Sequence, residues 1–370
     1  MKLLYICDEI NTKSGWATNT FNLVKEAKRK GHTVTVLTSR NANNNLPSSD
    51  IQVFQLLRSM KGGPKRIVNA YIDANNIKEI IDLKSYNAIH ITVEPLMLIA
   101  LFIKHPNIIL SLIGTYSDIL FTVGVNKWFY KLALSKMNKL TAISDYTAKV
   151  FREKTKSGIG LSVSVIPLGV DFDKFSSDKL YGEKSCSFVF VGHIKERKGL
   201  HVAIKALHTV KKTYPQVRLI VVGSIGDQKY YDKCIKLITK LDLKSNVDFK
   251  GNVLDIDLKS YYEESLACIL PSINAGQSFE GFGLVHLEAN ASGIPSIGSL
   301  ECGNETAISH GISGYLAHQN SNEDVAKYMN EIIFLWNNNE YQGLQLSARN
   351  FALGHTWELC FNKMADLYEK

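Results

Sequence analysis

The chain has 370 residues, of which 45% are hydrophobic and 21% charged, which is typical of a soluble globular protein with two domains. It contains no run of about 18 uncharged apolar residues, which argues against a membrane-spanning helix. Residues 1–180 carry 24 Lys and Arg against 14 Asp and Glu, whereas residues 181–370 carry 19 against 21. The basic first half favours an anionic membrane surface or a phosphate-bearing substrate as partner. Nucleic acid is disfavoured, because no aromatic stacking pattern or binding motif accompanies the charge.

The first apolar run and the cysteines indicate the cellular compartment of the protein. LLYIC (3–7) is too short for a signal peptide and is followed at once by Asp8 and Glu9. The six cysteines form no CxxC pair and lack the spacing of a metal site: Cys7, Cys186, Cys234, Cys268, Cys302 and Cys360. We therefore expect reduced thiols in a cytoplasmic protein.

Short apolar runs alternate with amphipathic stretches from the first residues onward. Strands are expected at 3–7, 33–38, 88–93, 108–113 and 140–144, with a helix near 15–30. Residues 164–185 have the composition of a linker. A second series follows, with strands at 187–192, 218–223, 247–251 and 267–272 and helices near 199–213 and 228–241. This rhythm predicts two α/β domains with parallel sheets, whose ligands bind beyond the carboxyl ends of the strands, in a cleft between the domains.

The stretch SFEGFGLVHLEANASG (278–293) carries two acids among apolar residues. A helix is expected from about Gly283 to Ala291, and its glycine-flanked start exposes N–H groups suited to a phosphate. Glu280 can accept hydrogen bonds from sugar hydroxyls, and Glu288 can accept them from the two hydroxyls of a ribose. A helix cap and a surface acid would explain the same residues.

A second cluster follows the strand SFVFVG. Lys195, Arg197 and Lys198 lie in the loop before the helix that begins at Gly199, where several cations suit a diphosphate. A solvated surface loop is the alternative explanation.

An ordered series of motifs runs along nearly the whole chain. It comprises SGWATNTFNLVKEAKRKGHTVTVLT, YNAIHI, LTAISDYTAKVF, VIPLGVDFDKF, VGHIKERKG, LIVVGSIGD, VDFKGNV, LPSINAGQSFEGFGLVHLEANASGIPSI and SHGISGYL. In order and spacing these resemble glycosyltransferase family 4, the group 1 glycosyltransferases. The resemblance implies the GT-B fold: two Rossmann-like domains facing a central cleft, with the C-terminal helix crossing back to the first domain. The expected domains are residues 1–175 with 355–370, which bind the acceptor, and residues 186–350, which bind the nucleotide sugar.

The resemblance also implies roles for individual residues. Glu280 matches the glutamate that faces the donor sugar, and Lys198 matches the diphosphate lysine, which Arg197 or Lys195 would assist. Glu280, Lys198 and Arg197 are the expected catalytic residues. The expected donor-binding residues are Gly15, Trp16, His193, Lys195, Phe282, Gly283, Leu284 and Glu288, the last for the ribose. The donor is a UDP- or GDP-sugar, transfer retains the anomeric configuration, and neither a metal nor a further cofactor is expected. The Asp171/Asp173 and Asp255/Asp257 pairs have no support as a metal site.

Two positions depart from the family pattern. His193 stands where the family has arginine, which replaces a fixed cation by a titratable imidazole. Ile113 stands where the family has a histidine that approaches the donor sugar, and isoleucine can neither hydrogen-bond nor transfer a proton. Glu94, Tyr116 and Asp118 are the candidates on this acceptor or sugar side, and each is also explained as a polar loop residue.

A structural explanation fits three further features, and for one of them a functional explanation also remains open. His90, in an apolar run, is interpreted as a positioned core histidine rather than a base. Residues 121–140 form either a basic amphipathic helix on an anionic membrane or a helix on the sheet with its lysines pointing outward. The segment 355–370 is expected to be a helix that packs on the first domain.

The resulting hypothesis is a retaining glycosyltransferase that acts on a glycan or lipid-linked glycan in polysaccharide or lipopolysaccharide synthesis. It would be cytoplasmic, with peripheral contact at the inner face of the membrane through the basic first domain. The alternatives are a catalytically impaired scaffold that binds nucleotide sugars, motivated by Ile113 and His193, and a sugar-nucleotide epimerase.

Overall fold

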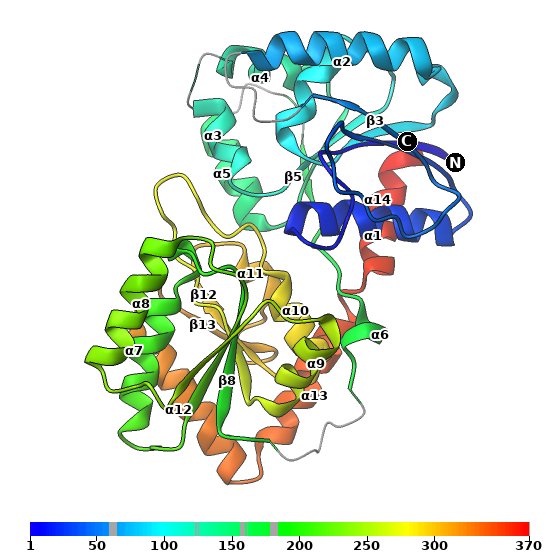
Figure 1. Ribbon diagram of the computed structural model, residues 1–370. Helices are drawn as coiled ribbons and strands as arrows, with labels where there is room; N and C mark the ends of the chain where they lie inside the picture. The colour runs from blue at the N-terminus through cyan, green and yellow to red at the C-terminus, as the bar shows by residue number, and fades with distance from the viewer. Residues whose placement is uncertain are drawn as a thin grey trace. The chain divides into compact units, whose positions relative to one another are not determined.

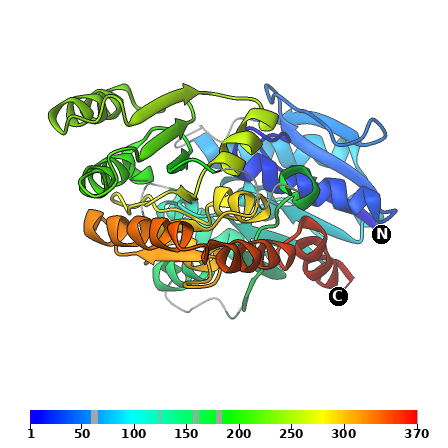
Figure 2. The ribbon, with the colours of Figure 1, turned by 90° about the horizontal axis from the view of Figure 1, so that it is seen from below.

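The computed structural model describes residues 1–58, 65–122, 124, 126–155, 160, 162–177 and 184–369 (Figure 1). The chain forms two compact units, Met1–Leu168 with Trp357–Lys370, and Gly169–Thr356. Both ends of the chain therefore belong to the first unit, as the two labelled termini in Figure 2 show. Across the described segments, no helix combines the length and the apolar character needed to cross a bilayer.

The first unit is built on a seven-stranded sheet in the order β3-β2-β1-β4-β5-β6-β7. Every strand pair in it is parallel. The strands are β1 (Lys2–Ile6), β2 (Thr33–Ser39), β3 (Gln52–Leu57), β4 (Ala88–Ile91), β5 (Ile108–Leu112), β6 (Lys139–Ala142) and β7 (Val163–Val165). The central strands are continuous runs of buried residues, as expected of a parallel sheet covered on both faces. The strand order reverses between β1 and β4, which places the ligand-binding edge of the sheet at the ends of these two strands.

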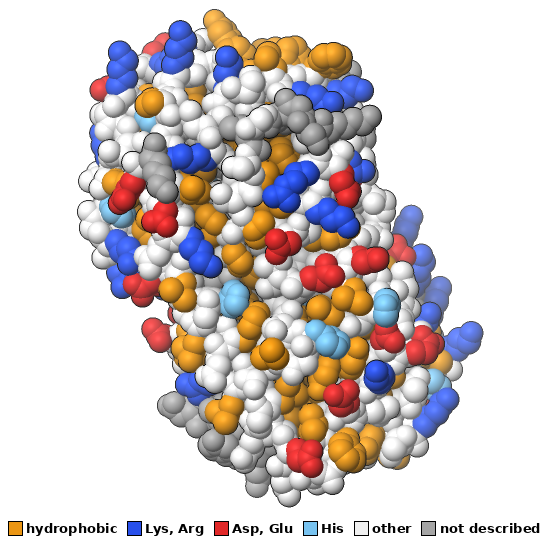
Figure 3. All heavy atoms as spheres, turned by 180° about the vertical axis from the view of Figure 1, so that it is seen from behind, with side chains coloured by type: hydrophobic (Ala, Val, Ile, Leu, Met, Phe, Trp, Pro, Cys, Tyr) orange, Lys and Arg blue, Asp and Glu red, His pale blue; other side chains and the backbone are white. Residues whose placement is uncertain are grey.

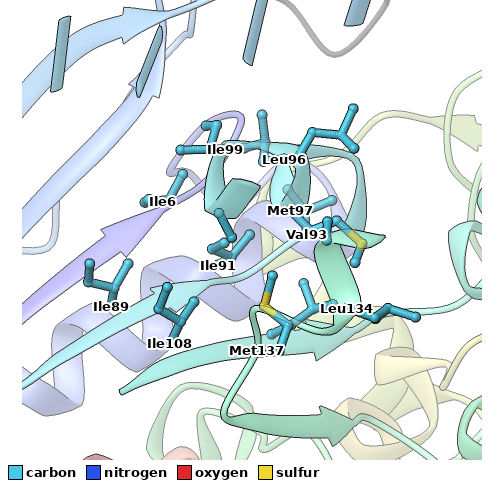
Figure 4. Packing of buried hydrophobic residues seen from close by; sticks show 14 of the residues in the cluster. Ile6, Ile89, Ile91, Val93, Leu96, Met97, Ile99, Ile108, Leu134 and Met137 are labelled. Carbon is cyan, nitrogen blue, oxygen red and sulfur yellow. The ribbon is translucent and has the colours of Figure 1, made fainter. Parts of the chain in front are cut away.

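Helices cover this sheet and close its core. They are α1 (Gly15–Arg29), α2 (Arg66–Ile80), α3 (Tyr116–Thr122), α4 (Lys127–Leu134), α5 (Asp145–Thr155) and α14 (Trp357–Glu369), with 3₁₀ turns η2 (Leu83–Ser85) and η3 (Glu94–Leu101). Figure 4 shows side chains of β1, β4 and β5 meeting those of η3 and the end of α4. The helix expected at 15–30 and the terminal helix expected at 355–370 are both present, and α14 packs beside α1 (Figure 1).

A buried network of hydrogen-bonded side chains attaches α14 to the sheet. The hydroxyl of Tyr368 lies 3.1 Å from the hydroxyl of Tyr5 and 2.8 Å from Nδ1 of His90. Nε2 of His90 lies 2.8 Å from Oγ of Ser111, which in turn lies 2.9 Å from Oγ1 of Thr141. His90 is 1% exposed and burial lowers its pKa to about 3, so it is a neutral core histidine, as interpreted from the sequence.

A buried carboxyl fastens the loop that follows β5. Glu94 lies directly beyond the end of β4 and is completely buried. One of its oxygens, Oε1, accepts hydrogen bonds from the backbone N–H of Ile113 and from the hydroxyl of Ser117, both at 2.8 Å. Burial raises the pKa of Glu94 to about 7, and these hydrogen bonds oppose part of the increase.

The second unit has a six-stranded parallel sheet in the order β10-β9-β8-β11-β12-β13. Its strands are β8 (Ser187–Val191), β9 (Arg218–Val222), β10 (Val247–Gly251), β11 (Ala267–Ile269), β12 (Ser296–Ser299) and β13 (Gly314–Ala317). Its helices are α6 (Phe172–Phe175), α7 (Leu200–Lys211), α8 (Gln228–Lys240), α9 (Asp255–Glu264), α10 (Leu284–Ala291), α11 (Asn304–Ala307), α12 (Asn322–Asn337) and α13 (Tyr341–Leu353), with the turn η4 (Glu196–Lys198). Here the strand order reverses between β8 and β11. The prediction of two parallel α/β sheets is confirmed.

The single amphipathic helix expected over residues 121–140 is wrong. The segment contains the end of α3, the short helix α4 and the start of β6, so Lys139 belongs to a strand. In α4, Tyr130, Ala133 and Leu134 are buried, whereas Trp128 and Leu132 are exposed. The break arises because Gly124 adopts a left-handed backbone, with φ of 89°, between the two helices.

We expect Tyr368→Phe to lower the free energy of unfolding of the first unit by about 1–3 kcal/mol, because both Tyr5 and His90 lose a buried hydrogen-bond partner. Urea unfolding followed by circular dichroism measures the change. Tyr71→Phe is the matched control, since Tyr71 is 52% exposed and its variant should stay within about 0.5 kcal/mol of the wild type. Equal losses of unfolding free energy in the two variants would contradict the stabilising role given to the hydrogen bonds of Tyr368.

We also expect Glu94 to make stability depend on pH. Its pKa lies at about 7 in the folded chain against an ordinary value of 4.5, so the folded state binds this proton more tightly. The contribution is therefore complete at low pH and is lost as the pH rises through the pKa of about 7. Glu94→Gln keeps an acceptor for Ile113 and Ser117 but cannot titrate. The wild type should thus lose stability relative to this variant between pH 5 and pH 7.5 in urea unfolding; parallel pH profiles would refute the assignment.

Candidate active site

Two loops meet where the strand order of the second sheet reverses. One follows β8 and contains His193, Lys195 and the turn η4; the other follows β11 and leads through Glu280 to α10. Because both loops leave the carboxyl ends of neighbouring strands, residues far apart in the sequence come together at this edge. The sheet therefore brings Arg197 and Lys198 to Glu280.

Glu280 is the centre of this cluster. Its Oε2 accepts a hydrogen bond from Nη1 of Arg197 at 3.0 Å, a close one from Nζ of Lys198, and one from Oγ of Ser272 at 3.2 Å. Glu280 is only 8% exposed, and burial by itself would raise its pKa. The charges of Lys198 and Arg197 more than offset burial and hold the pKa at about 2, so the carboxylate is ionised at neutral pH.

Two glycines allow close backbone contacts around this cluster, one between the loops after β8 and β11 and one in the loop after β12. Gly199 has a φ of 71°, and a side-chain carbon there would lie 1.8 Å from the carbonyl oxygen of Pro271. A side-chain carbon on Gly303 would lie 2.0 Å from the carbonyl oxygen of Gly281, and the N–H of Gly303 donates to the carbonyl of Glu280 at 2.8 Å. Gly303 and Ser272 were missed by sequence reasoning, because neither position carries a signal without its spatial neighbour.

The start of α10 lies next to this cluster. Gly283 precedes the helix with a φ of 92° and, as a glycine, has no side chain that could cap the first turn. The carbonyl of Phe282 accepts a hydrogen bond from Nδ2 of Asn304 at 3.0 Å, which fixes the entry to the helix. The N–H groups at the start of the helix carry the positive end of its dipole, which suits an anion. The predicted start of the helix near Gly283 agrees with the structure.

Glu288 lies within α10 and points toward α9. Its Oε2 accepts a hydrogen bond from the hydroxyl of the buried Tyr262 at 3.1 Å. Burial raises the pKa of Glu288 to about 7, with Tyr262 and Lys174 opposing the increase. Glu288 is therefore held in one orientation by a residue that the sequence did not indicate. In either protonation state a carboxyl oxygen remains able to accept a hydrogen bond from a sugar hydroxyl.

His193 and Lys195 lie in the same loop as η4. Nδ1 of His193 is 2.5 Å from Oγ of Ser224, and burial together with Lys195, Lys198 and Arg197 lowers the pKa of His193. The imidazole is therefore neutral at neutral pH and does not replace the positive charge of an arginine. The aliphatic part of Lys195 runs along Gly226, where an added side-chain carbon would lie 2.5 Å from its Cε.

The other predicted site residues belong to the first unit. Gly15 and Trp16 begin α1, and the ring of Trp16 stacks on that of Tyr116 at a centroid distance of 6.0 Å. Ile113 and Tyr116 are partly buried against the same hydrophobic core, and Glu94 accepts a hydrogen bond from the backbone N–H of Ile113. These residues follow β1, β4 and β5, so they lie beyond the carboxyl ends of three neighbouring strands of the first sheet.

Asp118 has a different environment from the other candidates. It is buried on α3, pairs with Nζ of Lys154 on α5 at 3.5 Å and accepts a hydrogen bond from Thr122. These contacts agree with its interpretation as a structural polar residue.

The two acidic pairs also have partners: Asp171 caps α6, and Asp255 pairs with Lys174 at 2.6 Å. In the described part of the chain, no group of three or more His, Cys, Asp or Glu residues is arranged to hold a metal ion. All six cysteines fall in described segments and are buried free thiols.

Two family models match the chain in succession. The model of glycosyltransferase family 4 matches residues 14–174, and that of the glycosyl transferases group 1 matches residues 171–345. An uncharacterized glycosyltransferase of Methanocaldococcus jannaschii is 27% identical over 314 residues, 83% of this chain and 81% of the relative. A GDP-mannose-dependent phosphatidylinositol monomannoside mannosyltransferase of Mycobacterium tuberculosis is 27% identical over 206 residues, 52% of each chain.

Solved structures share the whole fold. HepE of Anabaena, solved with UDP and glucose, superposes with a TM-score of 0.72 at 18% identity and 98% coverage of both chains. WaaG, a glycosyltransferase involved in lipopolysaccharide biosynthesis, superposes with a TM-score of 0.71 at 16% identity and 99% coverage of both. The ordered motifs, the two parallel sheets and the two family models together establish that this chain belongs to the group 1 glycosyltransferases, glycosyltransferase family 4, and has the GT-B fold.

Proposed function

We propose that this protein transfers a sugar, with retention of configuration, from a UDP- or GDP-sugar to a glycan or lipid-linked glycan. The observation that carries the proposal is the pairing of Glu280 with Lys198 and Arg197 beside the uncapped start of α10. This arrangement offers an acceptor for sugar hydroxyls and donors for a diphosphate within one small region.

The leaving diphosphate gains negative charge as the bond to the sugar breaks. Lys198 and Arg197 lie within reach of the same carboxylate, so they can also converge on one phosphate group. The N–H groups of Phe282, Gly283 and Leu284 add donors that need no reorganisation. In this proposal these fixed donors supply the stabilisation, and no metal is required.

The two glutamates bind opposite ends of the donor. Glu280 is ionised and accepts hydrogen bonds from the sugar, while Glu288, held by Tyr262, accepts them from the ribose. His193, neutral and paired with Ser224, contributes a hydrogen bond rather than a charge to this site. The proposed donor site therefore has one fixed cation fewer than the family pattern.

The first unit supplies the acceptor side. Trp16 and Tyr116 form an aromatic pair that suits the apolar face of a sugar ring. Ile113 extends this apolar surface in place of a histidine, and Glu94 holds its backbone. We assign Gly15 to the phosphate-facing start of α1, because its position is exposed and open to an approaching group.

A membrane-facing surface is the second part of the proposal. The α4 surface, defined as Lys127, Trp128, Phe129, Lys131 and Leu132, is exposed throughout, with Trp128 76% and Leu132 54% exposed. Residues 119–144 contain four lysines and no Asp or Glu. Figure 3 shows hydrophobic and basic side chains together at the edge of the first unit where Figure 1 places α2 and α4. Exposed aromatic side chains flanked by lysines favour an anionic bilayer surface.

This surface favours a lipid-linked acceptor used at the cytoplasmic face of a membrane. Two similar proteins support that choice by their own descriptions, since one acts on a phosphatidylinositol mannoside and another takes part in lipopolysaccharide biosynthesis. We therefore propose a role in polysaccharide or lipopolysaccharide synthesis.

Lys198→Ala should lower the rate at which nucleoside diphosphate is released from the preferred donor by at least about 100-fold, because a fixed cation is lost from the leaving group. The assay measures acceptor-free hydrolysis across a panel of UDP- and GDP-sugars. Lys205→Ala is the matched control, since Lys205 is exposed on α7, and it should retain wild-type activity. Wild-type turnover in Lys198→Ala would refute the proposed role. Donor binding without hydrolysis or transfer by the wild type would instead favour a scaffold, and an epimerised donor would favour an epimerase.

Trp128→Ala should weaken binding to vesicles about tenfold, because a large exposed side chain no longer enters the interface. Co-sedimentation with phosphatidylcholine vesicles that contain or lack phosphatidylglycerol measures the effect. The wild type should prefer the anionic vesicles, and added salt should weaken this preference. Phe334→Ala is the control, since Phe334 is 57% exposed on α12 of the second unit. Equal binding by both variants would argue against the α4 surface.

A further inference from the structure

The two cations assigned to the diphosphate are already paired with Glu280 in the structure. Lys198 and Arg197 both donate to Oε2 of Glu280, the same oxygen that Ser272 binds. The Lys198 side chain is 13% exposed and that of Glu280 10% exposed, so this pair is largely shielded from water. Lys198 and Arg197 have further N–H donors, so a diphosphate that binds here shares both cations with Glu280 and adds negative charge beside it.

Whether a ligand is favoured at this site depends on the hydrogen-bond donors that it offers to Glu280. A bare nucleoside diphosphate draws Lys198 and Arg197 toward its phosphates and leaves a buried carboxylate with weaker compensation, which is unfavourable. Its terminal phosphate also has a further ionisation at a pKa of about 6, which places more negative charge near Glu280. A nucleotide sugar lacks this ionisation, and its sugar hydroxyls donate to Glu280 in place of the cations.

We propose that Glu280 is a specificity-determining residue that makes the site favour nucleotide sugar over free nucleoside diphosphate. The proposal rests on the proposed donor site and adds to it a function in the absence of sugar. Glu280 acts as a repulsive element against the product, while the same carboxylate attracts the substrate. After transfer the sugar leaves, Glu280 loses its hydroxyl donors and recovers Lys198 and Arg197, which promotes release of the nucleoside diphosphate.

Isothermal titration calorimetry on the full chain tests this inference with UDP, UDP-glucose, GDP and GDP-mannose, in the absence of acceptor. Glu280→Gln keeps the size of the side chain and removes its charge. We expect this variant to bind the preferred nucleoside diphosphate at least about fivefold more tightly than the wild type and to bind the matching nucleotide sugar no more tightly. The ratio of the two Kd values should therefore shift at least fivefold toward the product.

Glu288→Gln is the matched control, because Glu288 lies on α10 and is assigned to the ribose that both ligands carry. This variant should bind both ligands more weakly by the same factor, so that the ratio of their Kd values stays unchanged. Thermal melts establish that each variant is folded, and Glu280→Ala provides a second variant with the same expected direction.

An unchanged ratio in Glu280→Gln and Glu280→Ala, or weaker binding of the nucleoside diphosphate by both, would overturn the inference while the donor site itself stands. Failure of the wild type to bind any of the four nucleotides would overturn the proposed function and this inference together.

Discussion

A buried carboxylate shared by two cations is the interaction on which the second unit depends. Glu280 lies in a largely water-excluded position, where a charge is tolerated only if opposite charges and hydrogen bonds surround it. Arg197, Lys198 and Ser272 meet that requirement from two different loops. The two loops can meet only because Gly199 has no side chain where it approaches the carbonyl of Pro271, and Gly303, in the loop after β12, likewise leaves room for the backbone of Gly281. The backbone of this region is therefore shaped by the need to neutralise one charge.

The two sheets use the same position for different chemistry. In each, functional side chains lie beyond the carboxyl ends of strands at or next to the point where the order reverses: β1, β4 and β5 in the first sheet, and β8 and β11 in the second. The second sheet gathers charges and backbone N–H groups there. The first gathers an aromatic pair, an isoleucine and a buried carboxyl with a raised pKa. A charged group for phosphates and a weakly polar surface for a sugar ring are complementary requirements of one transfer reaction.

Much of this architecture could be predicted from the sequence, because parallel strands are continuous apolar runs and the start of α10 carries its glycines. Strand β3, QVFQLL, was missed since it is half exposed and interrupted by glutamines. The break between α3 and α4 was missed because Gly124 changes the backbone locally. At the site, the motifs indicated Glu280 and Lys198 separately. Their mutual contact, the support from Ser272 and Gly303 and the partner of Glu288 depend on residues that only the fold brings together.

The attachment of α14 by Tyr368 has a consequence for how the chain acquires its structure. Tyr5 and His90, made early in synthesis, obtain their buried partner only when residue 368 has been added. The second unit, formed by Gly169–Thr356, has all its strands before that point. On the ribosome the later unit can therefore complete its fold first, and the earlier one must wait with an unfilled position against its sheet. The packing of the first unit is thus expected to be completed last, although its seven strands are made first.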